Sequence, residues 1–291
     1  MQILNPVRIF FIFITCNALA QNSFYYPGSF NAYFLNMSQI SPAFFPEEGK
    51  VELASGYKSL TGAFRKVSSY NFSAARIFRK NESAHLIRLQ FYNEKEGSYI
   101  SSPRAYASYG YLLPLSDNLS FFSAAALGFA GLYYSAPNTT QSSYNVPDGS
   151  IGLGLKSDWY ELGGSAMQIF SSELTPIAST VTLSRYYNLY TTVKKDFTSN
   201  WFVKAYGLYR IIPTTEPDII LTGAFGYLHN IEAGAAIKYN SGISFYGIFG
   251  VGIGEDRLKL LINYNSPVFG LVPKYQSNIE IGLSYLVISK E

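Results

Sequence analysis

The feature that most constrains this chain is an alternation of apolar with small or polar residues, repeated from residue 50 to the end. In the last such segment, Ile279 and Ile281 fall on one side of the alternation and Glu280 on the other. Successive side chains of a strand point to opposite faces, whereas an amphipathic helix requires a period near 3.6 residues, which no segment shows convincingly. We therefore predict an all-β chain.

Fourteen segments of this kind follow one another. They span residues 50–58, 69–79, 84–93, 103–114, 119–134, 149–157, 159–168, 184–196, 201–212, 218–228, 231–239, 243–252, 258–265 and 276–288. Each is near the roughly 9–11 residues that a tilted strand needs to cross a membrane, although several are longer. An even number suits a closed bacterial barrel with both ends on one side. We predict about 14 strands, within a range of 12 to 16.

The connections between these segments alternate in length. Short connections are 80–83, 115–118, 158, 197–200, 229–230 and 253–257. The other set holds the long connections 59–68, 94–102, 135–149, 169–183 and 266–275, together with the short 213–217 and 240–242. Short turns at one rim and long loops at the other are typical of outer-membrane barrels, and a soluble sandwich has no reason to sort its loops in this way.

The composition agrees with a membrane wall. Aromatic residues make up 17% of the chain and charged residues only 14%, whereas a soluble domain averages about 25% charged residues. No apolar run of about 18 residues follows residue 20, so helical spans are not expected. We predict a single closed antiparallel transmembrane β-barrel over residues 50–291.

Residues 1–20 have the form of a secretory signal. Arg8 precedes the apolar run 9–14, and 18–20 read Ala-Leu-Ala, a signal-peptidase pattern that would leave Gln21 first. A lipoprotein signal through Cys16 is the weaker alternative. Cys16 is the only cysteine, so cleavage would remove the means for disulfides, thiol catalysis and cysteine zinc sites. Export and a barrel together predict the outer membrane of a Gram-negative cell.

Residues 21–49 do not resemble a spanning strand, because prolines interrupt them and proline cannot donate to a sheet ladder. The segment is nevertheless rich in aromatic residues, and we expect it to start on the periplasmic side, with the short turns. Burial in the barrel lumen or against the periplasmic rim is favoured over docking on a partner, because large rings are then removed from water. The candidate plug or partner-docking residues are Tyr33, Phe34, Asn36, Pro42, Ala43 and Phe44.

The search for chemistry predicts no catalytic, cofactor or metal site. His85 and His229 are the only histidines, no spacing joins one to a nucleophile, and each is expected to face the lumen or lie in a turn. Removal of Arg8 leaves 21 basic against 19 acidic residues, a net charge of +2, so no nucleic-acid partner is predicted. Charged residues at mid-membrane should face the lumen. Those in or near strands are Arg76, Arg79, Arg88, Lys156, Lys194, Lys195, Lys204, Arg210, Lys238 and Lys259.

The aromatic and asparagine-containing stretch 31–36 is followed by Ser41-Pro42-Ala43-Phe44 and by Gly49. These motifs resemble the PorP/SprF family of outer-membrane barrels, which belong to the type IX secretion and gliding machinery of Bacteroidota. Further similarity lies in 104–115, 148–154 and 161–165. Ser41 stands where the family usually has Asn, and 57–62 lack the family's Trp.

The resemblance implies a barrel that performs no chemistry. It would assist delivery or surface anchoring of large secreted proteins such as adhesins, and would contact periplasmic ring components of the machinery as well as outer-membrane lipid. Two other hypotheses stay open. One is a channel for a small or hydrophobic solute with the N-terminal segment as its plug, and the other is a structural or adhesive barrel. A membrane hydrolase comes last, for want of a nucleophile and base.

Overall fold

The computed structural model describes residues 23–25, 30–46, 50–80, 83–135, 142–175, 180–213, 215–228, 230–239, 242–267 and 277–288. The predicted signal, Cys16 and His229 lie outside this part of the chain.

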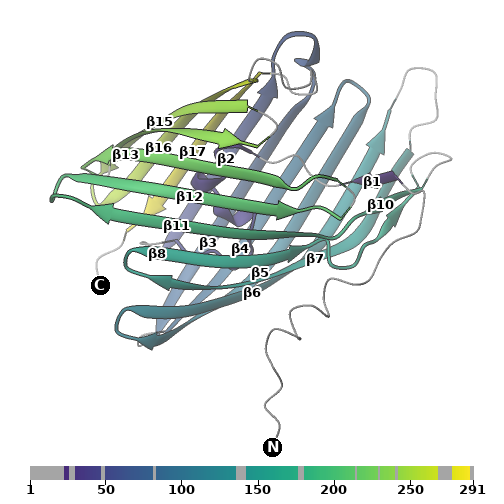
Figure 1. Ribbon diagram of the computed structural model, residues 1–291. Helices are drawn as coiled ribbons and strands as arrows, with labels where there is room; N and C mark the ends of the chain where they lie inside the picture. The colour runs from purple at the N-terminus through teal and green to yellow at the C-terminus, as the bar shows by residue number, and fades with distance from the viewer. Residues whose placement is uncertain are drawn as a thin grey trace, which may run out of the picture.

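Fourteen antiparallel strands form one closed barrel (Figure 1). The strands are β2 (Val51–Leu60), β3 (Ser68–Lys80), β4 (Ser83–Glu96), β5 (Ile100–Ser116), β6 (Leu119–Tyr134), β7 (Ser142–Ser157), β8 (Tyr160–Met167), β11 (Tyr186–Asp196), β12 (Trp201–Ile211), β13 (Asp218–Tyr227), β14 (Ile231–Lys238), β15 (Gly242–Ile253), β16 (Asp256–Pro267) and β17 (Asn278–Val287). The last strand, β17, pairs with β2, and β8 pairs with β11, so the wall has no open edge. The predicted fold class and strand number are confirmed.

The alternation in the sequence separates the two faces of the wall. In β13, Ile220 and Thr222 are buried in the interior, whereas Leu221 is 61% exposed and Phe225 is also exposed. Leu, Ile, Val and Phe dominate the exposed large side chains elsewhere on the strands. An outer face of this composition matches lipid and would be unstable in water.

The two rims differ in the length of their connections as predicted, but some of the long loops are shorter than expected. The expected loop 94–102 is only the turn 97–99, because Glu94 and Lys95 still pair with Ser102 and Ser101. In the expected loop 135–149, β7 already begins at Ser142. The alternation was missed in these hairpin ends because polar residues such as Glu94, Glu96, Ser142 and Ser143 interrupt the apolar pattern there.

The expected loop 169–183 contains two short strands, β9 (Glu173–Leu174) and β10 (Val181–Leu183). They form a small sheet with β1 (Ser23–Tyr25), which pairs with β10 in parallel. Leu174 and Leu183 pack with Leu132 and Val146 of the barrel wall. The sheet therefore covers the inside of the wall at the rim that carries the long loops.

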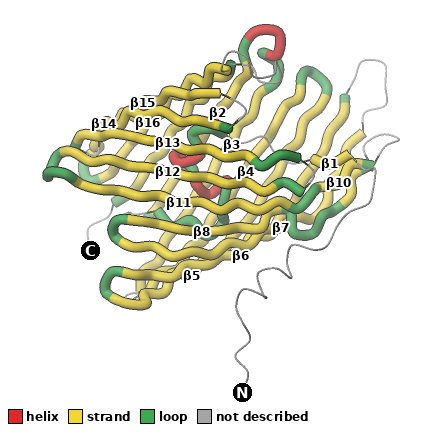
Figure 2. Tube along the Cα trace, viewed as in Figure 1, coloured by secondary structure: helices red, strands yellow, loops and turns green. Residues whose placement is uncertain are grey.

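The position of β1 contradicts one expectation. The N-terminal segment was expected to start on the side of the short turns, but β1 lies at the opposite rim, against β10 (Figure 1). Residues 30–46 then lie inside the barrel and include η1 (Tyr33–Leu35) and η2 (Met37–Gln39), seen as red turns in Figure 2. A third short turn, η3 (Gly62–Phe64), lies in the connection after β2. Among the described residues, no helix is long and apolar enough to cross a membrane.

Three polar side chains do not face the lumen as expected. In β3 the inward positions are Asn71, Ser73 and Ala75, so Arg76 is exposed on the outer side, beside the Phe78 ring. Lys195 is likewise exposed near the short turn after β11. Both lie toward the end of their strands, where a charge on the outer face costs only about 0–1 kcal/mol. His85 is also outside, where one ring nitrogen lies 2.7 Å from the Tyr109 hydroxyl.

Candidate functional site

The candidate site is the contact between residues 30–46, here called the lumen segment, and the inner wall of the barrel. The segment forms two single 3₁₀ turns and otherwise irregular backbone. Its own short-range hydrogen bonds satisfy few of its peptide groups, and a buried peptide group without a partner is costly. Side chains of the wall bind several of the other peptide groups.

Glu280 of β17 holds the beginning of the segment. Its two carboxylate oxygens accept hydrogen bonds from the backbone N–H groups of Asn31 and Ala32, each at 2.9 Å. Asn263 donates to the same carboxylate at 3.0 Å, and the Lys58 ammonium lies 4.0 Å away. Glu280 is only 1% exposed, so its charge is stabilised by these donors and not by water.

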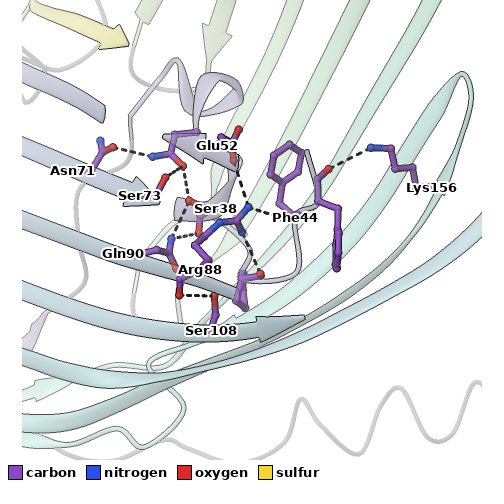
Figure 3. Close-up of polar contacts among 12 residues, drawn as sticks. Ser38, Phe44, Glu52, Asn71, Ser73, Arg88, Gln90, Ser108 and Lys156 are labelled. Atoms are coloured by element: carbon purple, nitrogen blue, oxygen red, sulfur yellow. Dashed lines mark hydrogen bonds and ion pairs between the residues drawn. The ribbon is translucent and has the colours of Figure 1, made fainter. Parts of the chain in front are cut away.

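Arg88 of β4 holds the end of the segment (Figure 3). Its guanidinium donates to the carbonyl oxygens of Pro42 at 3.4 Å and Phe44 at 2.9 Å. It also lies 3.6 Å from the Glu52 carboxylate, which compensates its charge. Arg88 is 0% exposed, so its two terminal nitrogens exchange water for these carbonyl and carboxylate oxygens, whereas its Nε is buried without a hydrogen-bond partner among the described residues.

Neutral side chains bind the middle of the segment. Asn36 donates to Asn71 at 3.0 Å, and Gln90 donates to the Ser38 carbonyl at 2.8 Å (Figure 3). The carbonyl of Ile40 accepts from Asn188 at 2.7 Å and from the Ser165 hydroxyl. The wall thus supplies donors from several strands to one short stretch of backbone.

Apolar contacts complete the fit. The Phe34 ring stacks on Tyr206 with centroids 4.8 Å apart and contacts Tyr246 at 4.6 Å. The wall carries glycine where the segment comes closest. A Cβ at Gly282 would meet Leu35 Cδ2 at 2.2 Å, and one at Gly152 would meet the Ser41 hydroxyl at 2.6 Å.

All six residues singled out in the sequence lie in this contact. Tyr33, Asn36 and Ala43 are buried. Phe34 packs against aromatic rings of the wall. The carbonyls of Pro42 and Phe44 both accept hydrogen bonds from Arg88. The residues missed are the wall anchors Glu280, Glu52 and Asn188. The signal for Glu280 was present, because it is a carboxylate on the inward face of an otherwise apolar strand.

Charged strand residues beyond Arg88 also lie on the inner wall. Lys204 pairs with Glu232 at 3.3 Å, and Lys238 pairs with Asp218 at 3.2 Å. Within the described part of the chain, no group of three or more His, Cys, Asp or Glu could hold a metal ion. The interior therefore carries paired opposite charges, between the neighbouring strands β13 and β14 for Asp218 and Lys238, and across β13 for Lys204 and Glu232.

A closed wall with an apolar outer face and a polar, occupied interior defines an outer-membrane β-barrel. Solved structures agree on the fold. The Pseudomonas putida toluene transporter TodX superposes with a TM-score of 0.51 at 11% identity, over 86% of this chain and 93% of the transporter. A Pseudomonas aeruginosa FadL homologue superposes with a TM-score of 0.53 at 9% identity, over 83% of this chain and 90% of the homologue.

The family match is more specific than the likeness of fold. Residues 22–285 match the family described as type IX secretion system membrane protein PorP/SprF, and the chain belongs to that family. This agrees with the resemblance drawn from the sequence motifs. No curated protein matches the sequence.

Proposed function

We propose that this protein is a non-enzymatic component of type IX secretion that assists the delivery or surface anchoring of large cargo proteins such as adhesins. The observation that carries the proposal is membership of the PorP/SprF family over residues 22–285. The occupied lumen supports it, because a barrel filled by its own segment is poorly suited to passing solutes.

The proposal divides the chain into three parts. Residues 1–20 act as a cleaved signal peptide, residues 21–49 as an aromatic segment that plugs the lumen, and residues 50–291 as the transmembrane barrel. Tyr33, Phe34, Asn36, Pro42, Ala43 and Phe44 are the plug or docking residues. The short turns face the periplasm, where they contact ring components of the machinery, and the long loops face outward toward cargo. No nucleic acid, cofactor or catalysis is involved.

The experiment is deletion of the gene, followed by comparison of the surface and medium proteomes with those of the complemented strain. Loss of one or a few large surface proteins, with other exports intact, would support a barrel dedicated to particular cargo. An unchanged surface proteome would exclude it.

The second candidate is a channel for a small or hydrophobic solute. The barrel superposes on a protein described as a toluene transporter, which favours this alternative at the level of fold. It predicts a conductance or solute flux of the intact purified barrel. A structural or adhesive barrel would show neither flux nor a change in secretion.

A further inference from the structure

The lumen segment crosses the barrel from one rim to the other. Its first peptide groups, at Asn31 and Ala32, donate to Glu280, which lies near the beginning of β17 at the rim with the long loops. Its end lies at the other rim, where the Phe45 carbonyl accepts a hydrogen bond from Lys156 at 3.3 Å. Lys156 is next to the last residue of β7, just before a short turn. The segment is therefore threaded through the lumen and does not return to the rim at which it begins.

The register of the strands gives the same direction. Arg88, which binds the Pro42 and Phe44 carbonyls, lies in a row of paired residues that runs through β3 and β2 and meets β17 at Leu286. Leu286 is near the end of β17, at the short-turn rim, whereas Glu280 is near its beginning. Each residue of a strand advances about 3.3 Å. The wall therefore holds the two ends of the segment at clearly different depths.

The segment is also long enough for this path. A fully extended chain covers about 3.3–3.6 Å per residue, so residues 31–45 could reach roughly 50 Å. The apolar band of an outer-membrane barrel is only about 25 Å tall. The turns η1 and η2 shorten the path of the segment, and the reserve of length accommodates them.

The covalent continuations of the segment lie at opposite rims. Before it, β1 pairs with β10 in the long connection between β8 and β11, so residues 23–25 lie at the long-loop rim (Figure 1). After it, the Lys50 N–H donates to the Val287 carbonyl at 2.9 Å, where β2 begins and β17 ends. Residues 23–25 and the end of the last strand are therefore on opposite sides of the membrane.

We propose that the chain is threaded outward, so that β1 and the sheet that it forms with β9 and β10 are displayed at the cell surface. The direction rests on the proposed function, in which the long loops face outward and the short turns face the periplasm. Periplasmic ring components cannot reach residues 23–25 in this arrangement. A partner that binds β1 is therefore an extracellular polypeptide, such as the secreted cargo.

The same path decides from which side a partner acts on the plug. The lumen segment joins the wall through Lys50 at the short-turn rim, and its other end continues into β1. A partner that draws β1 away from β10 therefore pulls the segment along its length toward the cell surface. The bonds from Asn31 and Ala32 to Glu280 are the first anchors that this pull reaches, before those of Arg88.

The test is labelling of single cysteines with a membrane-impermeant maleimide, first in intact cells and then after permeabilisation of the outer membrane. Cys16 is the only cysteine, so the unaltered protein gives the background. Ser23→Cys and Phe24→Cys place the thiol on the two faces of β1. Ser98→Cys marks the long-loop rim and Ser199→Cys the short-turn rim, both at exposed positions. We expect the Ser98 variant and at least one β1 variant to be labelled in intact cells, and the Ser199 variant only after permeabilisation.

Labelling of the β1 variants only after permeabilisation, together with the Ser199 variant, would overturn the proposal. Failure to label either β1 variant in both preparations would mean that β1 is enclosed, and would overturn it as well. If the Ser98 and Ser199 variants exchange their behaviour, the barrel has the opposite orientation and display at the cell surface fails. An unchanged surface proteome after gene deletion would remove the secretion role alone, because the labelling does not depend on secretion. Heat-modifiable migration on gels verifies that each variant is folded.

Discussion

At the scale of single residues, Arg88 is the strongest anchor of the lumen segment. Arg88→Ala would leave the Glu52 charge buried without its counter-ion and the Pro42 and Phe44 carbonyls without a donor. We expect a loss of about 3–5 kcal/mol in the free energy of unfolding, measured by urea titration in lipid vesicles. Arg76→Ala, on the outer wall, should change it by less than about 0.5 kcal/mol. Equal effects of the two substitutions would mean that the Arg88 contacts do not stabilise the barrel.

Gly282 provides a steric test of the same contact. Gly282→Ala would place a methyl group 2.2 Å from Leu35 Cδ2, so either the Leu35 side chain or the backbone that carries it must shift. We expect faster protease cleavage within residues 30–46 of the folded barrel. Gly223→Ala is the control, because nothing lies within 4 Å of its added Cβ. Protection identical in both variants would show that Leu35 adjusts without moving the backbone.

The sequence predicts which residues occupy the contact better than it predicts what they bind. The aromatic and proline content of 21–49 indicates burial, and all six chosen residues lie against the wall. The partners of the lumen segment come from strands up to 249 positions away, as in the bond from Asn31 to Glu280. Only the closure and register of the barrel bring these residues together, and alternation does not fix either. Arg76 and His85 show the same limit, since a shift of one position reverses the face.

At the scale of elements, the lumen segment is the part whose removal has the clearest consequence. Deletion of residues 30–46 removes the rings and backbone that fill the interior, including Tyr33, Phe34 and Ile40. We expect single-channel conductance in planar bilayers to rise well above that of the intact chain. Heat-modifiable migration on gels would verify that the shortened barrel is folded. A folded variant with unchanged conductance would contradict a plugging role.

The strands themselves were predictable, and the small sheet was not. All fourteen wall strands show the alternation because lipid and lumen impose different chemistry on the two faces. Strands β1, β9 and β10 have two or three residues each, too few for a period to be read. Pairing with a distant segment at the rim determines these strands, so β1 lies at the rim opposite to the one expected.

At the scale of the whole molecule, the outer face must be in contact with lipid, and this can be measured. Leu221 lies near the middle of β13 and is 61% exposed. Leu221→Arg should reduce the free energy of folding into vesicles by about 2–4 kcal/mol, because a mid-membrane charge on the lipid face loses its hydration. Leu228→Arg, which changes an exposed leucine in the turn after β13, should cost only about 0–1 kcal/mol. If the two substitutions cost the same, β13 does not cross the membrane at this depth. A larger cost for Leu221→Arg than for Leu228→Arg would show that the middle of β13 lies in the bilayer core and that the short turn after β13 lies at a bilayer interface.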